Sequence, residues 1–335
     1  MKIINNLHEK VELNWEQFVF KHSNGTFFQS PFYYKILNGV RKQSIIVFAA
    51  LDNNELCGIM LCSIQKEHLG ILGVFSSRSI IIGGPIVLNN NPIIIEALLN
   101  SYNSKIEKKV IYSQFRNLRL FSDEEKAIFE KYGYNYEAHL DILHNLKIPI
   151  EEQWRGIHKG RRKNIRRAEN AGLIFREIQS DSEFEKAYEL VKKTYKRVKL
   201  PMPDKSLFVE SYKHLKISRL FKIFIAEYES KIIATRMALC YNGLIYDWFA
   251  GADNGHLDKY PNDFLPWKVI EWGSLNGYKT FDFGGAGKPG VPYGVRDHKL
   301  KFGGELVEHG RFEKVHNKLL FQIGKIGMQL YKRIK

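Results

Sequence analysis

Apolar runs separated by short polar turns predict strands early in the chain. Residues 44–51 and 56–64 are two such runs, and they flank Asp52-Asn53-Asn54-Glu55. Asn and Asp adopt the backbone angles of tight turns easily, so the pattern predicts a β-hairpin. The same reasoning predicts strands at 78–88 and 110–115, and helices that begin after Ser30, at 92–104 and, with Ser122 as N-cap, at 123–131.

The order of these elements recurs in the second half of the chain. A hairpin is predicted from 221–227 and 231–240, followed by a strand at 244–250, a helix at 265–275 and a strand at 279–283. Corresponding pieces are separated by roughly 170 to 180 residues, far beyond the periods of repeat proteins. The chain is therefore predicted to be an α/β (α+β) protein with a duplicated domain, although two unrelated α/β domains would also fit this order.

A proline and an abrupt change in charge mark the predicted domain boundary. Pro149 is followed by a basic run, Lys159–Glu169, which places one domain at residues 1–149 and the other at 150–335. The arginines of the run would lie on its solvent-facing side. Apolar residues around the run predict a single helix with one buried stripe, namely Trp154, Ile157, Ile165 and Ala168.

Composition adds a positive surface field to this picture. The 335 residues carry 51 Lys and Arg against 36 Asp and Glu, a net charge of +15, and the hydrophobic content of 44% is that of a folded protein. A field of this sign attracts phosphates, nucleic acid or anionic membranes, although a lysine-rich proteome would also produce it.

The cysteines and the first residues narrow the cellular setting. Cys57, Cys62 and Cys240 lack the spacing of a zinc site or a disulfide framework, so no metal is expected. The first residues lack an apolar signal core, and no apolar run is long enough to cross a bilayer. We expect a cytoplasmic enzyme, with peripheral contact at the inner face of the membrane as an open alternative.

Candidate chemistry gathers where a predicted strand ends. Phe281-Asp282-Phe283 alternates two apolar residues with an acid and runs into Gly284-Gly285. A polar segment, His298–Gly304, follows and contains Lys299 and Lys301. Functional side chains are often carried on such loops beside a rigid strand, so the span is a candidate site.

The second half contains four pieces in a distinctive order, namely Gly243–Gly251, Tyr260–Trp272, Gly277–Gly285 and His298–Gly303. Their order and spacing resemble the Fem-type aminoacyltransferases, whose tandem domains are of the GCN5-related acyltransferase (GNAT) type. The resemblance covers the chain from about residue 150 to 312, and before that only the hairpin and the element order agree. Two features depart from the family: His298 stands where Phe is common, and no long charged helical arm is found between the domains.

The resemblance implies two tandem GNAT-like domains, each with a mixed, mostly antiparallel sheet flanked by helices. It also implies transfer of an acyl group to an amine, with aminoacyl-tRNA as the donor. The implied acceptor is a muropeptide or another cell-envelope precursor, such as a lipid- or nucleotide-linked sugar. No tightly bound cofactor and no DNA partner are expected.

Lys299 is the predicted catalytic cation. Amide formation passes through a tetrahedral oxyanion that a partly desolvated cation stabilises, and the family motif carries a functional lysine at this place. The alternative is a solvated lysine beside a turn. Lys301 is assigned to substrate binding, and an extended segment would point both lysines the same way.

Asp282 is the second predicted catalytic residue. A carboxylate buried between Phe281 and Phe283 would orient an incoming ammonium or accept its proton. The alternative is that it accepts hydrogen bonds from the following glycine amides and thereby shapes the turn.

Further substrate contacts are predicted on the strands around this turn. Tyr246 and Trp248 would share one face of their strand, with Asp247 on the other, either as an acceptor site or as core. Gly284 and Gly285 would line the strand exit with their backbone.

Basic residues supply candidate phosphate contacts. Arg162 and Arg166 would contact a tRNA backbone, a diphosphate or a lipid headgroup, or else form a solvated face. The resemblance adds Arg197 to the substrate-binding residues. The C-terminal segment 318–333 is amphipathic and basic, which suits either an anionic membrane or the protein's own core.

Two other functions stay open. Simple GNAT acetyltransferases hold the pyrophosphate of coenzyme A on a glycine-rich turn before a helix, whereas residues 253–260 offer no such turn. An acyl-CoA-dependent N-acyltransferase acting on an amino sugar is therefore the second hypothesis. A non-catalytic basic protein that binds tRNA or membranes is the third.

Overall fold

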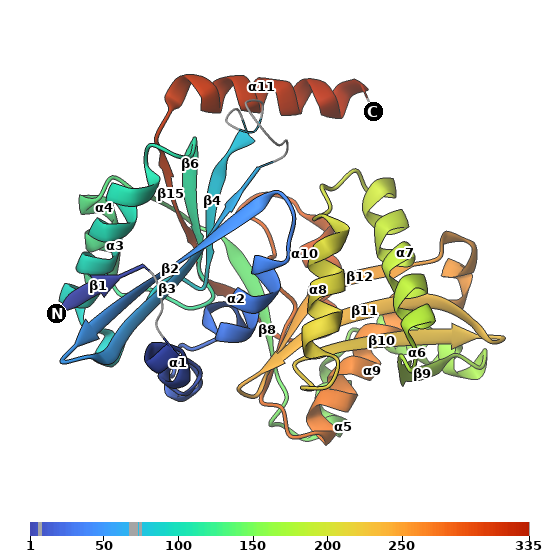
Figure 1. Cartoon of the computed structure of the whole chain (residues 1–335). Helices are drawn as coiled ribbons and strands as arrows, with labels where there is room; N and C mark the ends of the chain where they lie inside the picture. Colours follow the sequence, from blue (N-terminus) through green and yellow to red (C-terminus); the bar gives the residue numbers. More distant parts are fainter. Residues whose placement is uncertain (6–8, 67–72, 74–75, 335) are drawn as a thin grey trace. The chain divides into compact units, whose positions relative to one another are not determined.

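The computed structural model describes residues 1–5, 9–66, 73 and 76–334, and Figure 1 shows their course. Two compact units divide the chain. Unit 1 comprises residues 1–139, 204–210 and 308–335, and unit 2 comprises residues 140–203 and 211–307. Each unit is built around one twisted sheet.

The sheet of unit 1 has the strand order β1-β2-β3-β4-β6-β15-β7, and β5 pairs with β3 beside this path. The strands are β1 (Lys2–Ile4), β2 (Gln43–Asp52), β3 (Glu55–Gln65), β4 (Arg78–Ile82), β5 (Ile86–Val87), β6 (Tyr112–Arg116), β7 (Asn135–Glu137) and β15 (Arg311–Val315). The helices of this unit are α1 (Glu9–Lys21), α2 (Pro31–Asn38), α3 (Pro92–Ile106), α4 (Asp123–Lys131) and α11 (Lys318–Ile334), with short 3-10 turns at Phe27–Gln29 and Leu88–Asn90.

The sheet of unit 2 has the order β14-β8-β13-β12-β11-β10-β9. The strands are β8 (Leu140–Asn145), β9 (Ile174–Glu177), β10 (Phe221–Tyr228), β11 (Lys231–Tyr241), β12 (Leu244–Ala252), β13 (Thr280–Asp282) and β14 (Glu305–Glu308). The helices of this unit are α5 (Ile150–Gly156), α6 (Lys159–Asn170), α7 (Asp181–Arg197), α9 (Pro261–Leu275) and α10 (Gly294–Leu300), with a 3-10 segment at Asn254–Lys259. The helix α8 (Lys205–Leu215) is divided, with its residues up to 210 in unit 1 and those from 211 in unit 2.

The two sheets repeat one topology, which confirms the predicted fold class. An antiparallel meander, β1 to β4 in unit 1 and β9 to β12 in unit 2, is followed in each unit by one parallel neighbour. The parallel pairs are β4 with β6 and β12 with β13, and each is joined by a crossover that contains a helix, α3 or α9. The two predicted hairpins, β2–β3 and β10–β11, therefore occupy the same position in their sheets.

The two halves of the chain exchange one strand. In unit 1 the place next to β6 is taken by β15, which comes from the end of the chain, and in unit 2 the place next to β13 is taken by β8. Each exchanged strand carries core residues: Phe312 of β15 stacks on Phe129 at 4.1 Å, and Ile142 of β8 is fully buried in unit 2.

The boundary predicted at residue 150 differs from this division. The change of unit lies ten residues earlier, between His139 and Leu140, and residues 308–335 belong with unit 1. Pro149 instead forms the N-cap of α5. Pairing between distant strands sets the boundary, and no local signal in the sequence reports such pairing.

Several local predictions are confirmed. Both hairpins form, Ser30 caps α2, and Ser122 forms a capping box with Glu125 at the start of α4. The predicted strand 78–88 is interrupted because Gly83 and Gly84 have φ values of 81° and 72°.

The single helix predicted from Trp154 to Ala168 is wrong. Ile157 is extended and His158 is the non-helical N-cap of α6. The Nδ1 atom of His158 accepts a hydrogen bond from the Gly160 amide, so a new helix starts there. The helix predicted at 265–275 starts earlier, at Pro261. Ile157, Ile165 and Ala168 are buried as predicted.

One close approach between β12 and α7 gives a test of the packing in unit 2. A Cβ atom at Gly251 would lie 2.5 Å from backbone atoms of Leu190 and Val191. We expect Gly251→Ala to lower the free energy of unfolding by about 1–3 kcal/mol, because the backbone of α7 must move away. Thermal unfolding measures this as a melting temperature lowered by a few degrees.

The matched control for that change is Gly156→Ala. No atom lies within 4 Å of a Cβ built at Gly156, so its effect should stay within about 0.5 kcal/mol. Equal melting temperatures for the two variants would show that the contact with α7 does not constrain β12.

Candidate active site

The parallel strands β12 and β13 part after three residue pairs. Leu244 to Tyr246 pair with Thr280 to Asp282, whereas β12 continues to Ala252. A register shift at Met237/Ala238 of β11, opposite the stretch from Asp247 to Phe249, adds a local bend to β12 at this point. The edge of β12 that faces β13 therefore has backbone groups beyond the pairing, beside the glycine turn that follows β13.

Lys299 lies at this turn. Its Nζ atom donates hydrogen bonds to the carbonyl oxygens of Gly284 at 3.2 Å and Gly285 at 3.0 Å. Burial lowers the pKa of the Lys299 ammonium, while Asp247 and Asp141 act in the opposite direction. The structure thus places a half-buried cation, held by two backbone carbonyls, where β12 and β13 separate.

Asp282 is buried, with 2% of its surface exposed. One of its oxygens accepts a hydrogen bond from the Gly284 amide at 2.6 Å, and Gly284 has a φ of 66°. This is the turn-shaping role that the sequence left as an alternative. The carboxylate also lies within electrostatic reach of Lys299, so Asp282 belongs to the same cluster.

Tyr246 lies beside the same turn, and Trp248 packs elsewhere on β12. A Cβ atom at Gly284 would lie 3.4 Å from the Tyr246 hydroxyl. The Trp248 ring lies 5.8 Å from Phe221 and 4.9 Å from Phe249. The structure therefore brings Tyr246 to Lys299 and Asp282, and it gives Trp248 an aromatic packing environment.

An ion pair that the sequence analysis missed lies behind the cluster. Arg236 of β11 pairs with Asp247 of β12, and both side chains are largely buried. Each of these charges affects the pKa of Lys299. The available signal was Arg236 itself, a lone charge within the apolar run 232–240.

His298 is neutral at pH 7. Burial, and then the charge of Arg161, lower the pKa of His298 to about 4. The Nη2 atom of Arg161 lies 2.8 Å from His298 Nδ1, and because a guanidinium only donates, Nδ1 accepts and the ring proton is on Nε2. Arg161 also pairs with Asp263, so the first arginine of the basic run points inward.

Lys301 does not point to the same side as Lys299. The premise of an extended segment is wrong, because α10 extends to Leu300 and Lys301 is its C-cap. Residues two apart on a helix point about 200° apart. Lys301 is exposed, whereas Lys299 is half-buried.

Arg197 lies apart from the Lys299 cluster. It is exposed in the last turn of α7 and hydrogen-bonds the side chain of Asn254, just beyond the end of β12. Tyr246 is near the start of β12, and the distance along an extended strand from there to Ala252 is roughly 20 Å.

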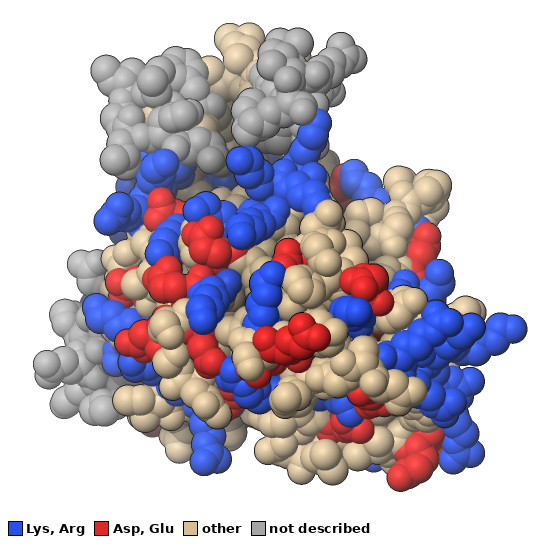
Figure 2. All heavy atoms as spheres, turned by 90° about the vertical axis from the view of Figure 1, so that its right-hand side faces the viewer, with Lys and Arg blue, Asp and Glu red and all other residues tan. Residues whose placement is uncertain are grey.

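The outward face of α6 carries Arg162 and Arg166, the two predicted phosphate contacts. Figure 2 shows one face of the molecule, with Lys and Arg gathered at its right-hand margin and mixed charges at its centre. Arg166 lies over the Trp154 ring at 5.6 Å, and Arg167 donates to the Tyr260 hydroxyl at 3.0 Å. A shallow depression of about 430 Å³ is bordered by α6 side chains alone, namely Lys159, Arg162, Lys163, Arg166, Arg167 and Asn170.

The start of α9 carries an acid where coenzyme-binding GNAT proteins would need donors. Tyr260 is the N-cap residue, with φ 57°, and Pro261 and Asp263 occupy the first turn. The buried Asp263 carboxylate accepts hydrogen bonds from Arg161 and, at 2.7 Å, from Asn164. The Asp263 carboxylate already provides an anion in the first turn of this helix, so the helix end is less suited to a second anion such as a pyrophosphate.

The corresponding strand exit of unit 1 is closed. β4 and β6 pair from Arg78–Tyr112 to Ile82–Arg116, and the Gly83 amide continues the ladder to the Arg116 carbonyl at 2.8 Å.

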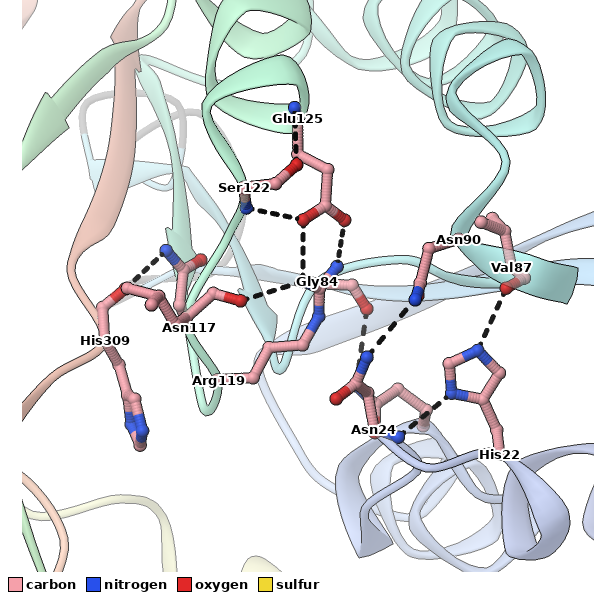
Figure 3. Close-up of polar contacts among 12 residues, drawn as sticks. His22, Asn24, Gly84, Val87, Asn90, Asn117, Arg119, Ser122, Glu125 and His309 are labelled. Atoms are coloured by element: carbon pink, nitrogen blue, oxygen red, sulfur yellow. Dashed lines mark hydrogen bonds and ion pairs between the residues drawn. The ribbon is translucent and has the colours of Figure 1, made fainter.

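Polar groups near this exit bind one another, as Figure 3 shows. Arg119 and the Ser122 amide both donate to Glu125, each at 2.8 Å, and Asn117 donates to the His309 carbonyl at 3.0 Å. Unit 2 is therefore the better candidate for chemistry.

The described residues place limits on two further classes of site. Among them, no group of three or more His, Cys, Asp or Glu side chains is arranged to hold a metal ion. No helix within the described ranges has both the length and the apolar content needed to cross a membrane.

Comparisons with known proteins bear on the fold and on the domain type. Residues 157–299 match the family model of the acetyltransferase (GNAT) domain, and this range ends at Lys299. No curated protein matches the chain in sequence.

Several solved structures share the fold of the whole chain. A crystal structure of FemX superposes with a TM-score of 0.74 at 15% identity, covering 96% of this chain and 99% of that one. L-PGS from Bacillus licheniformis gives 0.60 at 16% identity, with coverages of 94% and 93%. A tandem GNAT protein from the clavulanic acid biosynthesis pathway gives 0.60 at 8% identity, with coverages of 94% and 98%.

The fold and the family match lead to one assignment. The chain is an acyltransferase with a GNAT domain at residues 157–299 and the tandem GNAT fold of the Fem-type proteins.

Proposed function

We propose that the protein forms an amide by moving an aminoacyl or acyl group onto an amine of a cell-envelope precursor, with aminoacyl-tRNA as donor. The observation that carries the proposal is the half-buried Lys299 ammonium at the point where β12 and β13 part. The Fem-type resemblance of the second half supports the same reaction, and so does the shared fold of a putative lysylphosphatidylglycerol synthetase, TM-score 0.55. The acceptor class is a muropeptide or a lipid- or nucleotide-linked sugar, and the reaction would take place in the cytoplasm.

The proposed chemistry is aminolysis of an ester. The acceptor amine attacks the carbonyl carbon, a C–N bond forms, and the carbonyl oxygen becomes an oxyanion that Lys299 stabilises. The C–O bond to the tRNA ribose then breaks, and the proton lost by the amine is taken up by the leaving ribose oxygen. The carbonyls of Gly284 and Gly285 orient the ammonium, and Asp282 holds the turn that presents them.

The choice of donor rests on two features of unit 2. Asp263 already provides the anion at the start of α9, which disfavours the pyrophosphate of coenzyme A there. The outward face of α6 offers Arg162 and Arg166, together with neighbouring lysines, to a phosphate backbone. Acyl-CoA remains the alternative donor, and the following tests separate the two.

The role of Lys299 is tested by Lys299→Met, which keeps the length of the side chain and removes its charge. We expect kcat to fall by about 10²- to 10³-fold, the usual loss when one oxyanion donor is removed. The assay uses charged total tRNA with a nucleotide-linked muropeptide or amino sugar, and mass spectrometry detects the amide.

Two lysine variants control for nonspecific charge effects. Lys147→Met, an exposed position in unit 2, should leave the rate unchanged, and Lys301→Met should lose much less than Lys299→Met. Turnover of Lys299→Met at the wild-type rate would contradict the oxyanion assignment.

Coenzyme binding is tested with acetyl-CoA. Asp263 occupies the first turn of α9. Acetyl-CoA at a concentration about tenfold above the dissociation constant usual for a coenzyme site should therefore not raise the melting temperature of the protein. A rise of several degrees would favour the acyl-CoA alternative.

The α6 face is tested by Arg162→Gln combined with Arg166→Gln. Each phosphate contact removed should lower the slope of log K against log salt by about one, so the double variant should lose about two. Binding of total tRNA, measured over a range of salt concentrations, gives the slope. Lys108→Gln combined with Lys109→Gln, on exposed residues of unit 1, is the matched control, and equal slopes for the two pairs would remove α6 from the donor site.

A further inference from the structure

The C-terminal helix α11 (Lys318–Ile334) presents apolar side chains to solvent. Leu319 is 72% exposed, Ile323 53% and Ile326 56%. Their spacing of four and three residues places them in one narrow stripe of the helix. We call these three residues the outer stripe.

The opposite side of α11 already has a partner within unit 1. Phe321 packs against Tyr112 of β6 with ring centroids 5.3 Å apart, and Leu320 is half-buried. Figure 1 shows α11 running across the end of the sheet at which β6 begins. The helix is therefore docked on its own unit through Leu320 and Phe321, and the outer stripe is not part of that contact.

Positive charge borders the outer stripe. Lys318 and Lys325 are exposed and lie seven residues apart, on the same side of the helix. Lys325 also lies over the Phe321 ring at 4.5 Å. The sequence from 318 to 335 contains four Lys and one Arg and no Asp or Glu.

We propose that the outer stripe of α11 binds the surface of an anionic lipid bilayer, with the helix axis parallel to the membrane plane. Apolar side chains of an amphipathic helix enter the boundary between headgroups and acyl chains, and flanking lysines reach the lipid phosphates. A helix of this length extends roughly 25 Å along that plane.

Charge argues against a second copy of the chain as the occupant. Two copies that joined through the outer stripe would bring their lysine borders together without any acidic residue of α11 to neutralise them. An anionic bilayer complements both the apolar stripe and its border. The proposal does not depend on the acyl-transfer reaction, because it uses only unit 1.

The test is flotation of the full chain with vesicles of phosphatidylcholine, with and without phosphatidylglycerol. We expect the wild type to bind the anionic vesicles and the triple variant Leu319→Gln, Ile323→Gln and Ile326→Gln to bind at least about tenfold more weakly. Lys318→Gln with Lys325→Gln should weaken binding to anionic vesicles severalfold and leave the residual binding to neutral vesicles unchanged. All these side chains are exposed, and an unchanged melting temperature verifies that each variant is folded.

The matched control replaces three exposed apolar residues on other elements, Ile93→Gln, Ile217→Gln and Leu275→Gln, which are 69%, 90% and 72% exposed. This variant should bind vesicles like the wild type. The proposal is overturned if the α11 variant also binds like the wild type, or if Arg162→Gln with Arg166→Gln abolishes binding while the α11 variant retains it. It is likewise overturned if sedimentation shows a dimer that the α11 variant dissolves.

Discussion

The candidate site depends on how three residues of β13 are held. Thr280 to Asp282 pair in parallel with β12 on one side and antiparallel with β8 on the other, so this short strand is fixed from both edges. Its next residues leave the sheet as a glycine turn whose carbonyls receive the Lys299 ammonium. A strand any longer would continue the ladder with β12, as β6 does with β4 in unit 1, and would close the place where the cation lies.

The basic helix α6 performs two tasks on its two sides. Arg161 points inward to Asp263 and His298, and Ile165 and Ala168 are buried in the core of unit 2. Arg162 and Arg166 point outward and border the shallow depression. Burial, and then the charge of this inward arginine, lower the pKa of His298 next to Lys299, so the same helix that offers charge to solvent also contributes to the electrostatics beside the cation.

Local patterns in the sequence were sufficient for the elements and for part of the site. The polar turn at residues 52–55 and the caps at Ser30 and Ser122 report their own neighbourhood, and the structure confirms them. The glycines after Asp282 likewise predicted the end of a strand. What failed depended on contacts beyond the local sequence: the break of the helix at His158, whose amide donates to the Lys301 carbonyl, the helical state of Lys299, the pair of Arg236 with Asp247 on the neighbouring strand, and the change of unit at Leu140. Each of these is set by tertiary packing that overrides local propensity.

The exchange of β8 and β15 determines the order in which the two units can be completed during synthesis on the ribosome. The sheet of unit 1 begins with the first residues of the chain, yet its penultimate strand, between β6 and β7, is contributed by residues 311–315. Unit 2 has all its strands once residue 308 has been made. The unit whose synthesis starts first is therefore completed last. Until β15 has been made, β6 has no strand on that side, and Phe312 cannot pack against Phe129. Synthesis of the nascent chain thus leaves unit 1 with an open sheet edge until residue 315 has been made.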